Sequence, residues 1–563
     1  MPSRVYFWGR RQRRGLLPSL IGLVLVVLIV LPIVMIFARA VMVDGRLEFS
    51  GAIRTMTNPE NLTTISNTLL LGLAVVLGTT IITLPLALIL ARTQLGRQKW
   101  LDTVLMIPFM TPPYIASMGW ILFMQKRGLF QQLLPSSGAW SEKFFSFGGL
   151  VLVMSLHIFP FMLSILKNAI TNISANMEES AAVFGGGFFY RLRRVSLPLI
   201  SGNYAIGALL VFVKTLSEYG TPATLGRRIG FNVFATNIHQ YATISPIDFG
   251  RAASLSGVLI FICMAAWLLQ NHITTRASYQ LVGGKGNRVG SKKLSRLSLI
   301  TAWFLIAAVI IVAIGIPYFS VISTSVIKLR GYGLAAGNFT FAHYLTLFES
   351  LRSRSTFLVS IMLAISSASI ATILGTIIAV TVNRFKSRLS KVVEAIGLLP
   401  EMLPGIVLVI GIMLFWNRIY RFLPLYNTIG IMVLAYVTLF LPFTIQYVTS
   451  SLSQIGENLI QAGRAFGGSP FYVFRRITLP LLVKGIFVGW TMTFIISFRE
   501  LVTASLVAPP NTLVVSTFIM REFEQGSVSV GMAMAVICVL FTTSALSALS
   551  RFIDRQKKPA INL

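Results

Sequence analysis

Long apolar runs recur along the whole sequence, and most of them are long enough to cross a bilayer as a helix. A membrane helix needs about 20 consecutive apolar residues, and only 12% of this chain is charged, about half the share of an average soluble domain. So little polar surface cannot cover several water-soluble domains. The runs therefore predict an all-α polytopic membrane protein with about 12 transmembrane helices, at 16–43, 67–91, 103–124, 148–171, 195–217, 252–271, 297–327, 355–382, 390–416, 424–450, 479–498 and 528–550.

The first run, 16–43, has two possible interpretations. It follows several arginines, and Ala38-Arg39-Ala40 resembles the cleavage site of a signal peptide. The apolar stretch is longer than the roughly 7–15 residues of a signal sequence core. We therefore expect a retained first span with the N-terminus in the cytoplasm.

The net charge of +31 raises the possibility of nucleic-acid binding. The basic residues lie in short groups between apolar runs, however, and this is the pattern of loops held on the cytoplasmic side of a membrane. Residues 276–296 carry Arg276, Lys285, Arg288, Lys292, Lys293 and Arg296 without an acid. We expect no nucleic-acid partner, a cytoplasmic linker at 276–296, and both termini in the cytoplasm of a bacterial inner membrane.

The sequence also contains an internal duplication. Pro160-Phe161 and Pro442-Phe443 are 282 residues apart, and so are Arg194 to Leu199 and Arg476 to Leu481. This spacing predicts two parallel six-span repeats, 1–275 and 297–563, related by a pseudo-twofold axis along the membrane normal. The interface between the halves is then the natural place for a pathway.

Proline recurs inside several predicted spans, as at Pro108, Pro112 and Pro113. Membrane helices tolerate proline where neighbouring helices satisfy the freed backbone groups. Two interpretations stay open: simple kinks in packed helices, or broken helices that line a pathway.

A regular loop lies between the fourth and fifth spans of each half, at 176–198 and 458–480. In the first, Glu179 is followed six residues later by Gly185, and ten residues after that by Val195, one spacer, Leu197 and Pro198. The second repeats these spacings from Gln461 through Gly467 to Ile477, Leu479 and Pro480.

These loops resemble the EAA motif of permease subunits of bacterial ATP-binding cassette importers, and the likeness extends over nearly the whole chain. It implies a type I importer permease fold, in which the loop couples the spans to an ATP-binding subunit. The residues that it places in this role are Glu179, Ser180, Ala181, Gly185, Gln461, Ala462, Gly463 and Gly467. The sequence departs from the motif at Ser180, Gln461 and Gly463, so the second loop departs more.

The residues of the loops support this interpretation independently. A short amphipathic helix can run from Glu179 to Phe184, and Gly185 can end it, because glycine adopts left-handed geometry easily. Small residues such as Ala462 and Gly463 would let the surface of another protein approach closely. The alternative is an ordinary cytoplasmic turn, which explains one loop but not two in register.

No P-loop is present, because Gly283-Gly284-Lys285-Gly286-Asn287 lacks the required spacing and hydroxyl. We therefore expect no enzymatic activity and no bound cofactor in this chain. ATP would be used by two copies of a separate ATP-binding subunit. The resemblance also implies an extracytoplasmic substrate-binding protein, periplasmic or lipid-anchored, and the lipid bilayer is the remaining partner.

The substrate is the least determined property. The runs Ser497 to Ser505 and Ser217 to Ala223 most resemble permeases of ferric-iron uptake, while phosphonate, thiamine, polyamine and sugar-phosphate permeases share the scaffold. Glu218, Glu500 and Glu401 are candidate pathway residues, since carboxylates in or near a membrane are often functional. They have a structural alternative, in which Glu218 anchors its loop and Glu500 pairs with Arg499. No group of His, Cys or carboxylates predicts a metal site.

Two other classes of protein share part of this pattern. A secondary transporter shares the span count and the parallel repeat, but it does not need the paired loops and usually has coupling acids within its spans. A membrane enzyme needs a polar constellation near an interface, and the sequence shows none.

Overall fold

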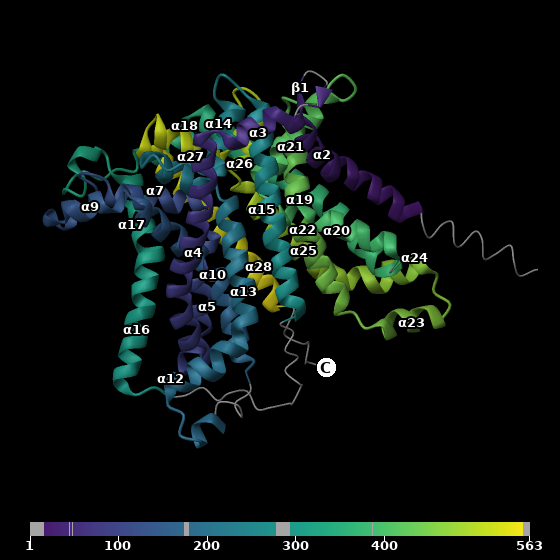
Figure 1. Ribbon diagram of the computed structural model, residues 1–563, viewed down its shortest axis with the longest axis horizontal. Coiled ribbons are helices and arrows are strands. Elements are labelled where there is room, and N and C mark those ends of the chain that lie inside the picture. The colour runs from purple at the N-terminus through teal and green to yellow at the C-terminus, as the bar shows by residue number, and fades with distance from the viewer. Residues whose placement is uncertain are drawn as a thin grey trace, which may run out of the picture.

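The computed structural model describes residues 16–43, 46–47, 49–173, 180–276, 293–385 and 387–555, and these are mostly helical. Figure 1 shows the long helices running side by side in one bundle. Within the described residues, β structure is confined to single bridge residues at Thr93, Ile327 and Phe339 and a hairpin of β1 (Met42–Val43) and β2 (Arg46–Leu47). The predicted all-α class is confirmed.

The elements of the first half are η1 (Val26–Val30), α2 (Leu31–Val41), α3 (Phe49–Thr57), α4 (Pro59–Arg92), η2 (Gln94–Arg97), α5 (Lys99–Leu105), α6 (Ile107–Met110), α7 (Pro113–Met124), α8 (Leu129–Leu133), η3 (Pro135–Ser137), α9 (Gly138–Phe144), α10 (Phe147–Thr171), α12 (Phe188–Arg191), η4 (Leu192–Ser196), α13 (Leu197–Ser217), η5 (Pro222–Gly226), α14 (Phe234–Thr243) and α15 (Phe249–Arg276).

Those of the second half are α16 (Arg296–Ile310), η6 (Ile311–Gly315), α17 (Ile316–Val326), η7 (Arg330–Tyr332), α18 (Ala342–Glu349), α19 (Leu351–Phe385), α20 (Arg388–Met402), α21 (Gly405–Arg418), α22 (Ile429–Ser453), α23 (Glu457–Ala465), α24 (Pro470–Val473), η8 (Phe474–Thr478), α25 (Leu479–Phe498), α26 (Val502–Val507), α27 (Val515–Glu524) and α28 (Val528–Arg555).

Ten helices of the described chain are long and apolar enough to cross a membrane. The third segment of each half is not one continuous helix. The span expected at 103–124 is divided among α5, α6 and α7, and the span expected at 390–416 is a helix pair, α20 and α21, bent by 113°. The described residues thus hold ten continuous candidate spans, or eleven if the bent pair is one span. The breaks lie at Thr111-Pro112 and Leu403-Pro404, where proline lacks the N–H that would continue the helix.

The outer faces of the bundle are apolar. On α4, the exposed residues Leu70, Leu73, Leu77 and Ile81 follow one another at intervals of three or four and so share one face. The same pattern marks α16, with Leu297, Ile300 and Phe304. Helices α10 and α22 are the most buried of the spans. Lipid-facing stripes around buried central helices are the arrangement of a multi-pass membrane protein.

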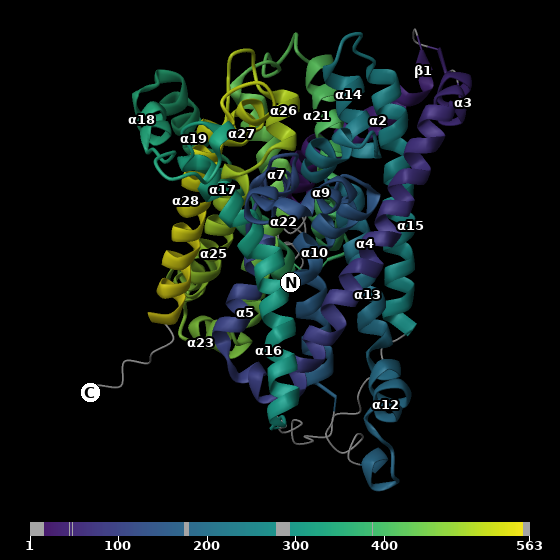
Figure 2. The same cartoon turned by 90° about the vertical axis from the view of Figure 1, so that its left-hand side faces the viewer.

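The duplication is visible in the helices themselves. Helices α10 and α22 each have 25 residues and begin 282 residues apart, and the π-helical turns η4 and η8 are also 282 residues apart. The short loop helices α12 and α23 lie toward the same end of the bundle in both views (Figures 1 and 2). We call this end the loop end. The two halves therefore have the same orientation.

Each half packs its third segment against the first span of the other half. A Cβ atom added at Gly119 of α7 would lie 2.6 Å from the carbonyl oxygen of Pro317 in α17. A Cβ atom added at Gly411 of α21 would lie 2.6 Å from the carbonyl oxygen of Pro32 in α2. Glycine permits this close approach of two helices, as is common inside membranes. The two contacts lie at equivalent positions of the repeat, so the arrangement is symmetric. We call it the exchange of first spans, because the first span of each half packs against the other half.

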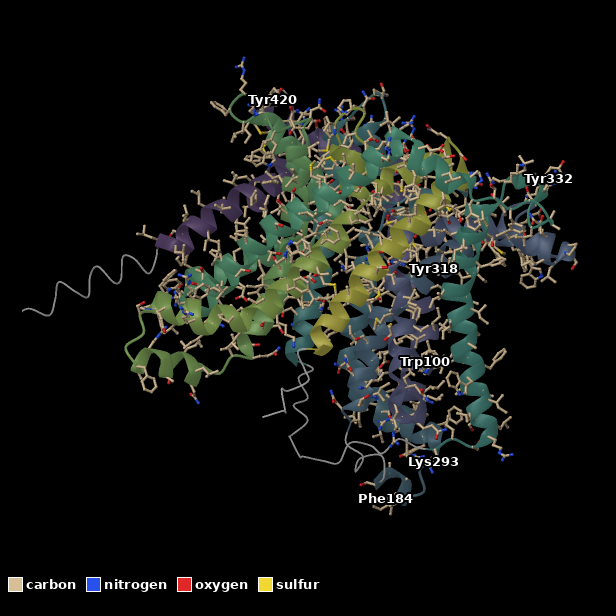
Figure 3. All side chains as sticks on the ribbon, turned by 180° about the vertical axis from the view of Figure 1, so that it is seen from behind. Trp100, Phe184, Lys293, Tyr318, Tyr332 and Tyr420 are labelled. Atoms are coloured by element: carbon tan, nitrogen blue, oxygen red, sulfur yellow. The ribbon has the colours of Figure 1, made fainter. Side chains whose placement is uncertain are left out.

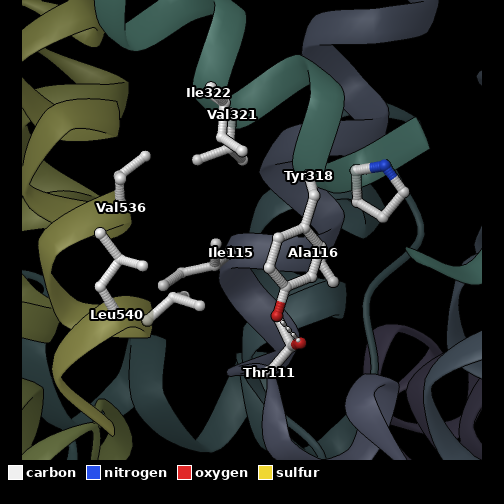
Figure 4. A pocket seen from close by; sticks show the side chains of 10 residues that line it. Thr111, Ile115, Ala116, Tyr318, Val321, Ile322, Val536 and Leu540 are labelled. Atoms are coloured by element: carbon white, nitrogen blue, oxygen red, sulfur yellow. Dashed lines mark hydrogen bonds between the residues drawn. The ribbon is translucent and has the colours of Figure 1, made fainter. Parts of the chain in front are cut away.

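A hydrogen bond supports one of these contacts. The hydroxyls of Thr111 and Tyr318 are 2.7 Å apart, and apolar side chains of α7, α17 and α28, including Ile115 and Leu540, surround them (Figure 4). The pair joins the break in the third segment of the first half to the first span of the second half.

Candidate functional site

The two predicted coupling loops have the same backbone structure where both are described. In each, a short helix ends with three hydrogen bonds at equivalent positions. The bond that spans the most residues joins Gly186 N–H to Ala181 O at 2.9 Å in the first loop and Gly468 N–H to Gly463 O at 3.1 Å in the second. Gly185 and Gly467 both have φ of +80°. The glycine helix stop is therefore confirmed, because residues other than glycine rarely adopt this geometry. Linker residues 277–292 and Glu179 lie outside the described residues.

The other predicted coupling residues do not all face outward. Ser180, Gln461 and Ala462 are exposed, and Ala181 is half-buried. A Cβ atom on Gly463 would lie 2.6 Å from Cδ1 of Ile477, within its own loop. Glycine at this position therefore also permits close packing within the loop, and the expectation that it admits another protein stays a prediction.

The sequence interpretation missed the most prominent side chains of the loops. Phe184 is 90% exposed and Phe466 is 92% exposed, and they occupy equivalent positions of the repeat. Figure 3 shows Phe184 at the tip of the loop end, far from Tyr420 at the opposite end. Two further exposed aromatic pairs recur at the same spacing: Phe189 with Phe471, and Tyr190 with Tyr472. The sequence signal that could have identified them is an aromatic residue in a loop of small residues, repeated after 282 positions. Exposed aromatic side chains of this kind typically mark a protein interface.

A cavity of about 300 Å³ lies between the halves. Its walls come from the broken third segment of the first half, from α10, and from the ends of α13 and α25 with the residues that follow them. Glu218, Glu500, Arg499 and Lys214 all line it, together with Pro112 and Pro113. At Pro112 and Pro113 the broken helix that lines a cavity is observed, whereas Pro85, Pro160 and Pro442 lie inside continuous helices.

Both candidate acids anchor the turn that follows their helix. The backbone N–H of Thr221 donates to both carboxylate oxygens of Glu218, each at 3.1 Å. The backbone N–H of Thr503 donates to Oε1 of Glu500 at 3.1 Å, and its hydroxyl does so at 3.2 Å. The anchoring expected for Glu218 is present, and Glu500 has the same role. Each carboxylate still lines the cavity.

The cations of the cavity have other contacts. The Arg499 guanidinium donates to the carbonyl oxygen of Met110, which belongs to the other half. The expected pairing of Arg499 with Glu500 is therefore replaced by a contact across the interface. The Lys214 ammonium lies 5.8 Å from the centre of the Phe161 ring, a cation–π distance.

Glu401 is placed differently from the other two acids. It lies near the end of α20, is exposed, and accepts a hydrogen bond from the side-chain amide of Gln446. It is not among the residues that line the cavity. The structure thus brings together Glu218 and Glu500 and leaves Glu401 outside.

The fold and these paired sites define a class of protein. The family model for the binding-protein-dependent transport system inner membrane component matches the chain twice, at 83–279 and 371–559. The chain belongs to this family. Proteins of this family work with a substrate-binding protein and with ATP-binding subunits, and they are multi-pass proteins of the inner membrane.

Similar proteins include two from Haemophilus influenzae. The chain is 22% identical to its Fe(3+)-transport system permease protein FbpB 2 over 98% of this chain and 99% of that protein. It is 27% identical to its spermidine/putrescine transport system permease protein PotC over 43% of this chain and 91% of PotC. The ferric transport system permease protein FbpB of Actinobacillus pleuropneumoniae is 24% identical over 84% of this chain and 69% of its own length.

Proposed function

We propose that this chain forms the pathway of an ATP-driven importer for ferric iron, which a binding protein delivers from outside the membrane. Two copies of a separate ATP-binding subunit dock on the two loops, one on each, and hydrolyse the ATP. The observation that carries the proposal is the pair of equivalent loops, each with an exposed phenylalanine, in a chain whose two halves enclose a cavity.

Iron is favoured as substrate by the relatives that match most of the chain in length, since they are named as ferric permeases. A polyamine is the second candidate, because PotC proteins match about half of the chain. Phosphonate, thiamine and sugar phosphate are further alternatives within the same importer class.

Reconstitution tests the proposal directly. Proteoliposomes that contain the chain, its ATP-binding subunit and ATP should accumulate ⁵⁵Fe when the iron-loaded binding protein is added, and ATP hydrolysis should rise with it. Accumulation of labelled spermidine in place of iron would transfer the assignment to polyamines. Iron uptake that is driven by an ion gradient without ATP would identify a secondary transporter instead.

The orientation proposed here places both termini and the loop end in the cytoplasm. A reporter inserted within 276–293 is expected to be cytoplasmic, and one within 328–352 to be periplasmic, because basic loops remain inside. Alkaline phosphatase and green fluorescent protein fusions measure this in intact cells. The same location for both segments contradicts the assignment.

The two cavity acids are proposed to act on the cargo as well as on their turns. A glutamine keeps the acceptor oxygen for Thr221 or Thr503, so E218Q and E500Q should each reduce uptake only moderately. The double variant removes both charges from one cavity, and its loss should exceed the sum by about 0.5–3 kcal/mol. Iron uptake measured at equal membrane abundance decides this, with E142Q, a change at an exposed acid of α9, as the control. Additive losses would leave only the anchoring role.

A further inference from the structure

A second cavity lies above the first, at the end of the bundle opposite the loop end. It has a volume of about 340 Å³ and is lined by Tyr219, Arg227 and His239 from the first half and by residues 501–525 of the second half, including Arg521 and Glu524. Helices α14, α26 and α27 surround it, at the top of the bundle in Figures 1 and 2. We call it the outer vestibule. Tyr219 and Leu501 line both cavities, so the two adjoin.

The halves are in contact at the floor of the vestibule. Nε2 of His239 lies 3.0 Å from Oγ of Ser505, and the Tyr219 and His239 rings are 4.7 Å apart. Burial and the Arg227 guanidinium lower the pKa of His239 to about 4, so the imidazole is neutral at physiological pH. The positive charge of the vestibule therefore comes from arginine alone.

Basic side chains outnumber acidic ones around the vestibule. Arg227 and Arg521 line it, and Arg228 stacks on the Phe523 ring at 5.3 Å, close enough to interact with Glu524. Glu524 is the acid among the lining residues, and burial raises its pKa although Arg227 and Arg228 oppose the shift. The neighbouring Glu522 accepts from the backbone N–H of Ser527 at 2.9 Å. The guanidiniums of Arg227 and Arg228 thus act on this carboxylate, and Arg521 lines the same cavity.

We propose that the outer vestibule binds the oxyanion groups of a small ligand, carboxylate or phosphate, through Arg227 and Arg521. A guanidinium presents paired N–H donors that match such groups. A bare cation, whether ferric ion or polyamine, is repelled there. A ferric complex that carries its own oxyanions suits both the arginines of the vestibule and the carboxylates of the adjoining cavity. This description of the cargo rests on the proposed function, whereas the anion site does not.

Direct binding tests the site without iron. The full transporter complex in neutral-lipid nanodiscs is titrated with citrate and, separately, with inorganic phosphate, by calorimetry. The variant R227Q/R521Q should bind the anion about tenfold more weakly or worse. The control R418Q/R421Q removes the same charge from exposed positions near Tyr420, also at the end opposite the loop end (Figure 3), and should bind as the unaltered complex does.

The arms of the experiment identify the source of the oxyanion. Tighter binding of citrate than of phosphate identifies the natural ligand as a chelating carboxylate. Binding of phosphate that citrate displaces shows that one site accepts either ion. Equal affinity in R227Q/R521Q and the unaltered complex, or an equal loss in the control, overturns the proposal. So does weaker docking of the binding protein with no change in anion affinity. If ⁵⁵Fe uptake fails in the unaltered complex while the anion still binds, only the cargo assignment falls.

Discussion

Replacing Phe184 and Phe466 together with aspartate is expected to separate the chain from its ATP-binding subunits and to abolish uptake. Each ring is almost fully exposed at the end of a loop helix, and an aromatic anchor at an interface commonly contributes 2 kcal/mol or more. A carboxylate in its place brings an unpaired charge into an apolar site. Co-purification of the ATP-binding subunit with the tagged chain measures the effect.

The control for this variant is F422D, because Phe422 is 86% exposed and lies two residues after Tyr420, which Figure 3 shows at the end opposite the loop end. It should co-purify normally with the ATP-binding subunit. Each single variant should retain one docked subunit, so a partial yield is expected. Full co-purification and full ATP hydrolysis in the double variant would remove the loops from the docking surface.

Replacing Gly119 or Gly411 with valine is expected to cause the largest loss of folded protein. The new Cβ atom would lie 2.6 Å from a backbone carbonyl oxygen of the other half, so a helix has to move, and overpacking of this kind costs about 1–3 kcal/mol or more. Because the contacts are equivalent, the two variants should be affected similarly. Thermal unfolding in detergent, followed by size-exclusion chromatography, measures the loss.

The matched control is G257V. Gly257 also lies within a span, but its nearest neighbour is a flexible Phe37 side-chain atom at 3.6 Å, an ordinary contact distance. Its melting temperature should stay close to that of the unaltered chain. If G119V and G411V unfold no earlier than G257V, the exchange of first spans does not stabilise the fold.

The sequence predicted the features that repeat or that depend on local geometry. The class of fold, the duplication and the left-handed conformation of Gly185 and Gly467 follow from apolar length, from the spacing of 282 and from the properties of glycine. These need no knowledge of which helix contacts which.

The packing partners could not be predicted in the same way. Lipid and protein interior are both apolar, so periodicity does not separate a lipid-facing stripe from a buried one. Nothing in the sequence around Gly119 indicates that it touches Pro317. The breaks at Pro112 and Pro404 were equally undetermined, since a proline either kinks or breaks a membrane helix according to its neighbours. The shared cavity of Glu218 and Glu500 depends on both features.

The exchange of first spans also determines the order in which the molecule can be completed during synthesis. The surface of α7 around Gly119 is covered by α17, which leaves the ribosome about 200 residues later. At 5–20 residues per second, the nascent first half waits roughly 10 to 40 s for this helix. Carrying both halves on one polypeptide ensures that the missing helix arrives in the same membrane, in the correct number and next to its position. Two separately translated halves would have to meet by lateral diffusion with these surfaces uncovered.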